Sequence, residues 1–240
     1  MPLILDRIHK VKTARLNSGK KRTKEWASMP SLFSEDRQPS DDYLAIPKVS
    51  SERRLYLPIS FAQKEWIASG SLLIVPNATL HDFGVLNSSM HMAWTRQVCG
   101  RLESRYQYSA SVVYNNYPWP GFAGEALSDK HRTTIEQAAQ CVLDARDQFA
   151  NSSLADLYDP LTMPPALHKA HQKLDTAVDA AYQPSGGKKT YATDAERVAF
   201  LFDLYQRITS LLPVPARKNK KKIDTKLTDT FPAGSANKKR

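Results

Sequence analysis

The stretch His91–Pro120, HMAWTRQVCGRLESRYQYSASVVYNNYPWP, contains the change of pattern that divides this chain. Its first part has apolar residues at helical spacing, and Ser89 just before it can cap a helix that runs to about Leu102. Its last part, Tyr114–Pro120, is rich in aromatic residues and proline and ends the region. Strand and helix patterns alternate before this stretch, and only helix patterns follow it. We therefore expect a boundary at about residue 120.

Three short segments before the boundary have strand-like patterns. In Leu55–Phe61 apolar residues alternate with others, although Pro58 restricts the segment to an edge strand or a bulged one. Tyr43–Val49 is a second candidate and also contains a proline, Pro47. Ser71–Val75 is a third, and its unbroken apolar run indicates burial on both faces. The first 120 residues are therefore expected to be mixed α/β.

Three helices are expected after the boundary: Ser128–Phe149, Pro165–Tyr182 and Asp194–Leu212. Pro165 suits a first helical turn, and Asp194 suits an N-cap. Beyond them the chain is basic and poor in apolar residues, which is typical of disorder. The predicted fold class is thus α+β, with a mixed α/β region over 1–120, an all-α region over 121–214 and a disordered basic tail over 215–240.

The composition limits the class of protein. Of the 240 residues 41% are hydrophobic, which is enough for a packed core. No run is long enough to span a membrane, and the amino terminus lacks the features of a signal peptide, so we expect a cytoplasmic protein. The two cysteines, Cys99 and Cys141, stand alone, which excludes a disulfide framework and a cysteine-rich zinc site.

The charge balance favours a polyanionic partner. There are 34 Lys and Arg against 24 Asp and Glu, a formal net charge of +10. Leu3–Lys24 has the spacing of an amphipathic helix with a cationic outer face. A solvated basic surface is the alternative interpretation. If the partner is DNA, the residues expected to contact its phosphates are Lys10, Lys12, Arg15, Lys20, Lys21, Arg22, Arg96 and Arg101.

The sequence lacks the common motifs for catalysis. There is no GxGxxG or GxxxxGK[ST] turn that would hold a nucleotide cofactor. Asn115-Asn116-Tyr117-Pro118 has the letters of an adenine-methylating loop in the wrong order. His168 and His171 lie three apart, but no carboxylate at helical spacing completes a metal site, so a solvated or capping role is expected for them. No catalytic residue and no metal ligand is therefore predicted.

One local pattern has the chemistry of base recognition. Glu103 and Arg105 alternate, so on an extended segment they project the same way. Arginine can donate two hydrogen bonds to guanine, and glutamate can accept one from cytosine, so the two could read the halves of one C·G pair in the major groove. The alternative is a surface ion pair worth under about 1 kcal/mol.

Three long segments resemble a known family. They are SSERRLYLPI over Ser50–Ile59, the opening stretch His91–Pro120, and SLADLYDPLTMPPALHKAHQKLDTAVDAAY over Ser153–Tyr182. Together they resemble the C-terminal part of the MmeI-like DNA methyltransferases, and the similarity runs from about Leu3 to Leu212. These are large single-chain restriction–modification enzymes, or methyltransferases of related defence systems, that transfer a methyl group from S-adenosylmethionine to adenine N6.

The resemblance implies the last two domains of that family: a partial target recognition domain over 1–120 and the C-terminal helical domain over 121–214. The cofactor-binding and catalytic motifs lie upstream in the family, so this chain is expected to hold no cofactor and to be inactive alone. The family's base-reading pair falls on Glu103 and Arg105, and Gln107 and Ser71 fall on other specificity positions.

The implied partners are double-stranded DNA and, where it is encoded separately, a methyltransferase or nuclease portion. Two rival functions stay open. One is a truncated remnant or a subunit that acts only by protein–protein interaction, and exposed apolar surface at its upstream edge would favour it. The other is a general basic nucleic-acid binder, which would show strong salt dependence and no sequence preference.

Overall fold

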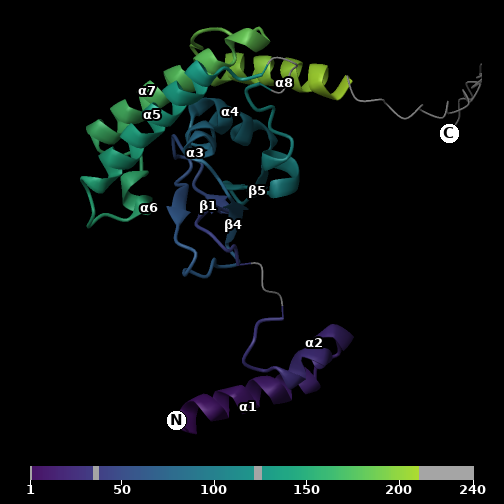
Figure 1. The fold of residues 1–240 in the computed structure, drawn as a ribbon. Helices are drawn as coiled ribbons and strands as arrows, with labels where there is room; N and C mark the ends of the chain where they lie inside the picture. The colour runs from purple at the N-terminus through teal and green to yellow at the C-terminus, as the bar shows by residue number, and fades with distance from the viewer. Residues whose placement is uncertain (1, 35–37, 122–125, 211–240) are drawn as a thin grey trace, which may run out of the picture.

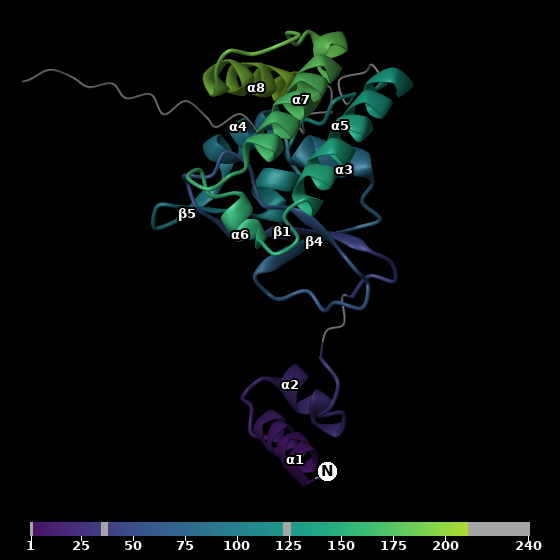
Figure 2. The same cartoon turned by 90° about the vertical axis from the view of Figure 1, so that its left-hand side faces the viewer.

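The computed structural model describes residues 2–34, 38–121 and 126–210, arranged as Figure 1 shows. The first of these ranges, which we call the N-terminal helical unit, contains α1 (Pro2–Leu16), α2 (Lys21–Glu25) and the 3-10 turn η1 (Trp26–Ser28). Figures 1 and 2 show this unit standing apart from the other described residues, which we call the body.

The first sheet of the body is antiparallel, with the order β3-β1-β4. Its strands are β1 (Tyr43–Pro47), β3 (Ser60–Ala62) and β4 (Leu72–Pro76). Leu44 at the centre lies opposite Phe61 on one side and Val75 on the other. The connection over residues 63–71 returns the chain from one end of β1 to the other, and the Tyr43 hydroxyl donates a 2.5 Å hydrogen bond to the Trp66 carbonyl within it.

The second sheet has the order β2-β6-β5 and is also antiparallel. Its strands are β2 (Val49–Ser50), β5 (Gly100–Leu102) and β6 (Arg105–Gln107). β5 and β6 form a hairpin, with Leu102 paired to Arg105. Because Lys48 alone separates β1 from β2, the two sheets are joined through this residue.

The helices begin where side chains can cap their free amide groups. Thr79 and Asp82 form a capping box at α3 (Leu80–Leu86), and Ser88 caps α4 (Ser89–Val98). Ser128 caps α5 in the same way. The other elements of the body are η2 (Ala110–Tyr114), α5 (Asp129–Asp147), α6 (Leu154–Leu157), α7 (Pro165–Ala181), η3 (Gln183–Ser185) and α8 (Asp194–Ser210).

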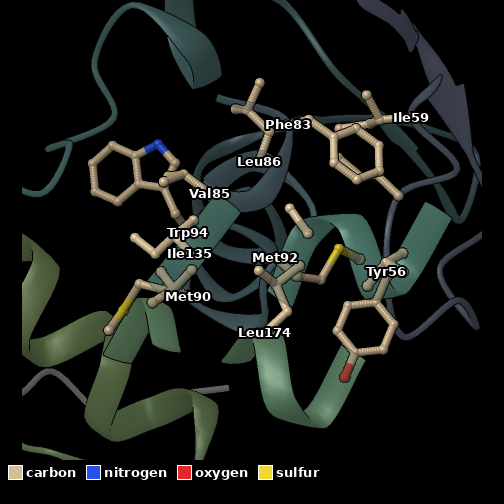
Figure 3. Packing of buried hydrophobic residues seen from close by; sticks show 14 of the residues in the cluster. Tyr56, Ile59, Phe83, Val85, Leu86, Met90, Met92, Trp94, Ile135 and Leu174 are labelled. Atoms are coloured by element: carbon tan, nitrogen blue, oxygen red, sulfur yellow. The ribbon is translucent and has the colours of Figure 1, made fainter. Parts of the chain in front are cut away.

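One hydrophobic core extends through the strands and the helices. Phe83 and Met90 from α3 and α4 belong to the same buried cluster as Ile135 of α5 and Leu174 of α7, as Figure 3 shows. α3 approaches α5 closely at Gly84, where a Cβ atom would lie 2.7 Å from Cγ2 of Ile135. The mixed α/β and helical regions are therefore packed as one body.

A buried polar cluster also joins the two regions. Arg146 of α5 donates a 2.8 Å hydrogen bond to the Ile59 carbonyl, and its guanidinium also contacts the Tyr158 hydroxyl. That hydroxyl lies 2.7 Å from Nε2 of His171, whose Nδ1 faces the Asn87 carbonyl at 3.2 Å. His171 is fully buried, so the solvated or capping role expected for it is wrong. His171 is a core residue, and both of its ring nitrogens have hydrogen-bond partners.

The α+β class is confirmed, with a helical C-terminal part. The expected basic helix Leu3–Lys24 is two helices, because Asn17-Ser18-Gly19 interrupts it. The helix that was expected to run from Ser89 to about Leu102 ends at Val98, since the chain turns there into the β5–β6 hairpin. Thr193, and not Asp194, caps the last helix, because its hydroxyl accepts from the Glu196 amide at 3.3 Å.

The strand predictions were partly wrong. Of the segment Leu55–Phe61 only Ser60 and Phe61 lie in a strand, which continues to Ala62, since Pro58 has no amide hydrogen for a ladder. The apolar run at β4 is an edge strand whose side chains are half-buried, so it is not covered on both faces. The predicted disordered tail over 215–240 lies outside the described residues.

Within the described ranges we find no helix with the length and apolar character that crossing a membrane requires.

Candidate nucleic-acid interface

The tip of the β5–β6 hairpin brings Glu103 and Arg105 into direct contact. Leu102 pairs with Arg105, so Glu103 and Ser104 form a two-residue loop. Nη2 of Arg105 donates a 2.7 Å hydrogen bond to Oε2 of Glu103. The side chains are 46% and 77% exposed, respectively. The tip therefore presents an acceptor and a fork of donors to solvent, side by side.

This geometry corrects the reason for expecting the two residues together. They do not alternate along an extended segment, because Glu103 lies in the turn with φ of 58°. Positive φ is uncommon for a residue with a side chain, and it costs free energy unless the surroundings hold it. In two-residue hairpin loops such a φ matches the twist of the strands. Glu103 therefore contacts Arg105 from a turn position and not from the same side of a strand.

Arg101 stabilises the hairpin loop through contacts with Tyr106 and Ser104. Its guanidinium lies 4.2 Å from the ring centroid of Tyr106 and donates to the Ser104 carbonyl at 3.2 Å. The Tyr106 ring is buried, and its hydroxyl reaches the Glu52 carbonyl at 3.3 Å. Arg101 was predicted to contact phosphate, and the structure places its guanidinium against the protein, where it holds the loop.

Gln107 and Ser71 are linked to this hairpin through Lys48. The Lys48 amide donates to the Ser71 carbonyl at 2.9 Å, and the Lys48 carbonyl accepts from the Tyr108 amide at 2.7 Å. Gln107 is exposed, like Arg105 two residues before it, whereas Tyr106 between them is buried. Gln107 and Arg105 therefore share the solvent face of β6. Ser71 is joined to Lys48 by a backbone hydrogen bond.

Lys48 is a contributor that the sequence reasoning missed. Besides its backbone bonds, its Nζ donates to the Gly70 carbonyl at 2.7 Å and so fixes the turn before Ser71. In the sequence, Tyr43–Val49 looks like one strand, and nothing in it signals that residue 48 changes sheets. All four residues predicted to contact bases are thereby attached to one backbone framework.

The framework is supported underneath by a neutral histidine. Nδ1 of His91 faces the Leu86 carbonyl at 2.8 Å, and Nε2 lies 3.0 Å from the Tyr108 hydroxyl. Burial lowers the pKa of His91 to about 4. A neutral ring donates from Nδ1 and accepts at Nε2, which satisfies both contacts. Tyr108, next to Gln107, is thus anchored without a buried charge.

Two other arginines predicted to contact phosphate are held by protein atoms. Arg96 forms an ion pair with Asp194 and donates to the Arg54 carbonyl at 3.2 Å, so it ties α4 to α8. Arg15 donates to the carbonyl oxygens of Trp26, Met29 and Leu32 at 2.7–2.8 Å.

The other predicted phosphate contacts are basic residues of the N-terminal helical unit. Lys10 pairs with Asp6 at 2.7 Å. The remaining predicted phosphate contacts lie exposed on the N-terminal helical unit: Lys12, Lys20, Lys21 and Arg22.

The described residues do not offer a metal site. Over 2–34, 38–121 and 126–210, no group of three or more His, Cys, Asp or Glu side chains could hold a metal ion.

Two family models match consecutive parts of the chain. Residues 1–121 match the family model "MmeI, target recognition domain", and residues 127–213 match "MmeI, C-terminal domain".

Similar proteins are much longer than this chain. DNA methyltransferase A of Bacillus subtilis (strain 168) is 38% identical over 208 residues, which is 87% of this chain and 22% of the relative. A solved structure of the type IIL restriction-modification enzyme MmeI in complex with DNA is 49% identical, with a TM-score of 0.79, over 88% of this chain and 27% of that protein. The chain thus spans about a quarter of the length of each relative.

Proposed function

Because the chain belongs to the MmeI family, we propose that it is the part of a DNA-modifying enzyme that recognises a specific duplex sequence. It corresponds to the target recognition and C-terminal domains of a larger DNA methyltransferase. The observation that carries the proposal is the contact of Glu103 with Arg105 at the hairpin tip.

The pair suits one C·G base pair in the major groove. The Arg105 fork donates to O6 and N7 of guanine, and the Glu103 carboxylate accepts from N4 of the paired cytosine. Each side chain already lies beside the other and protrudes from a braced loop, so little conformational freedom is lost on binding. A good bidentate contact of this kind discriminates against the wrong base by about 1–3 kcal/mol.

Gln107 and Ser71 read neighbouring positions in this proposal. Gln107 shares the face of Arg105, and its amide can pair with adenine N6 and N7. The Ser71 hydroxyl, now 3.0 Å from that of Ser69, can donate or accept. Their attachment to Lys48 keeps the spacing between the two reading positions fixed.

The basic residues supply affinity without sequence information. Lys12, Lys20, Lys21 and Arg22 contact phosphates, and Lys10 contributes after leaving Asp6. Arg15, Arg96 and Arg101 add positive potential while they hold backbone carbonyls in place. Methyl transfer belongs to another part of the enzyme, joined to this chain or encoded separately, which binds S-adenosylmethionine and acts on adenine.

Selection from a pool of random duplexes at fixed salt tests the proposal. The purified chain is expected to enrich one motif that contains an invariant C·G pair. Affinity for that motif should exceed affinity for a scrambled duplex by at least tenfold at 150 mM salt, as one good base contact provides. Equal affinity for all sequences, falling steeply with salt, would instead identify a general basic binder.

A further inference from the structure

The N-terminal helical unit has almost no interior of its own. Between residues 2 and 34, Ala27 is the only buried side chain, with 2% of its surface exposed. Neither α1 nor α2 contains a buried residue. Figures 1 and 2 show the unit away from the body, so the body does not cover it.

Large apolar side chains of this unit lie open to solvent instead. Leu3 is 81% exposed and Phe33 is 70% exposed. A monomeric protein rarely leaves so many large apolar groups of one short segment in water, and such groups mark interaction sites. The exposed set is Leu3, Ile4, Leu5, Val11, Leu16, Met29, Leu32 and Phe33.

Hydrogen bonds and an ion pair inside the unit lie mostly at its surface. Arg15 donates to three carbonyl oxygens, and Lys10 pairs with Asp6. Exposed ion pairs contribute little to stability, and helices as short as α1 are marginal in water. A segment of this size without a core needs additional apolar surface from elsewhere to stay folded.

We propose that the N-terminal helical unit folds against a protein surface of the methyltransferase-side portion of the enzyme. The inference rests on the proposed function. The unit lies within the match to the target recognition domain, and most of each relative lies outside the region matched by this chain. That unmatched portion is the occupant we assign, whether it is joined to this chain or separate.

The charge of the unit indicates how it is oriented. It has eight Lys or Arg residues and two Asp or Glu residues between positions 2 and 34. DNA phosphates cannot bury leucine and phenylalanine side chains, so a protein covers the apolar groups, and the exposed lysines remain for the duplex. The protein surface that covers the unit should therefore be apolar at its centre, and the lysines should lie at the edge of this interface that faces DNA.

Hydrogen exchange measured on two proteins tests this assignment. The first is the full chain, at a concentration where sedimentation shows a monomer. The second is MmeI with its matching segment replaced by this chain, which is feasible at 49% identity. In the isolated chain, amides of residues 2–34 should exchange within tenfold of unstructured rates, while amides in the α5 and α7 cores stay protected. In the chimaera the same amides should slow at least 100-fold.

Variants locate the surface. Leu5→Gln with Phe33→Gln should reduce the protection of residues 2–34 in the chimaera at least tenfold. The matched control, Lys12→Gln with Lys20→Gln, should leave this protection unchanged, because it replaces two exposed residues of the same unit with the same side chain and removes no large apolar group.

Three results would overturn the proposal: equal protection of the unit in the isolated monomer, protection that rises with concentration and so comes from a second copy, or no effect of the apolar variants. Failure of DNA selection leaves these readouts intact, so the two proposals can fail separately.

Discussion

The hydroxyl of Tyr56 donates a 2.7 Å hydrogen bond to the carboxylate of Asp175, which lies 119 residues later in the chain. The same carboxylate accepts from the Ser89 amide at 2.6 Å and from its hydroxyl at 2.8 Å. Asp175 lies on α7, and burial raises its pKa. One side chain of the C-terminal helical region thus holds both a loop and a helix start of the recognition region.

Replacing Asp175 should destabilise the joint that its carboxylate forms with Tyr56 and Ser89. Asp175→Ala leaves the Tyr56 hydroxyl and the first amide of α4 without their acceptor, and we expect a loss of about 3 kcal/mol in the free energy of unfolding. Tyr56→Phe removes one hydrogen bond and should cost about 1 kcal/mol. Urea unfolding measures both. A loss below 0.5 kcal/mol for Asp175→Ala would show that the joint contributes nothing.

Arg146 should not tolerate lysine. Its guanidinium reaches the Ile59 carbonyl, the Tyr158 hydroxyl and the Asn87 amide oxygen at once, which a single ammonium group cannot do. Arg146→Lys should lower the free energy of unfolding by about 2 kcal/mol because buried acceptors lose their donor. Arg132→Lys, at an exposed position of α5, is the control and should be neutral. Equal stability of the two variants would contradict the assigned role.

Stability should fall below neutral pH because of two buried histidines. Burial lowers the pKa of His91 to about 4 and that of His171 to about 3, whereas the unfolded chain has the ordinary value near 6.5. Their contribution is therefore complete above pH 6.5 and is lost as the pH falls toward the folded values. Each histidine should cost about 2 kcal/mol between pH 6.5 and 5.

Burial raises the pKa of Asp175 and Asp179, which has the opposite sign and offsets part of the loss at the acidic end. Urea unfolding across pH 5–7 measures the slope, and the ring protons of both histidines in NMR spectra give their protonation state. A histidine that titrates near pH 6.5 in the folded protein would contradict this account.

The salt dependence of DNA binding should distinguish residues that contact phosphates from residues that contact bases. Lys20→Ala with Lys21→Ala should weaken binding to every duplex alike and lower the slope of log Kd against log salt by about 2, since each contact contributes about 0.9. Gln107→Ala should leave the slope unchanged and relax the preference at one base position. Fluorescence anisotropy over a salt series distinguishes the two. A Gln107→Ala variant with unchanged preference would remove this residue from the reading set.

Local signals in the sequence were sufficient for much of the helical region. Ser128 and Pro165 mark helix starts because capping and a fixed proline φ act within one turn. Leu55–Ile59 could not be assigned in this way. Tyr56, Leu57 and Ile59 are all buried although this part of the chain is irregular, so the alternating apolar pattern does not come from one face of a strand.

The sequence proposed residues for the candidate site, and the structure gives two of them a geometry that the sequence did not predict. The spacing of Glu103 and Arg105 suggested a shared side of a strand, whereas their contact depends on a positive φ in a hairpin loop. Lys48 was missed because its role lies in bonds to residues 71 and 108, far away in the sequence. Such contacts depend on the pairing of the sheets, which one sequence does not reveal.

The most direct test of the central claim is selection from random duplexes with the exchange variant Glu103→Lys/Arg105→Asp. Asp203→Lys/Arg207→Asp is the matched control, because it inverts an exposed ion pair of 3.0 Å on α8 and keeps the net charge. Our account predicts that the exchange variant enriches a motif changed at one base pair, the C·G position, while the control enriches the original motif. An unchanged motif from the Glu103→Lys/Arg105→Asp protein would contradict the claim that these two residues read DNA.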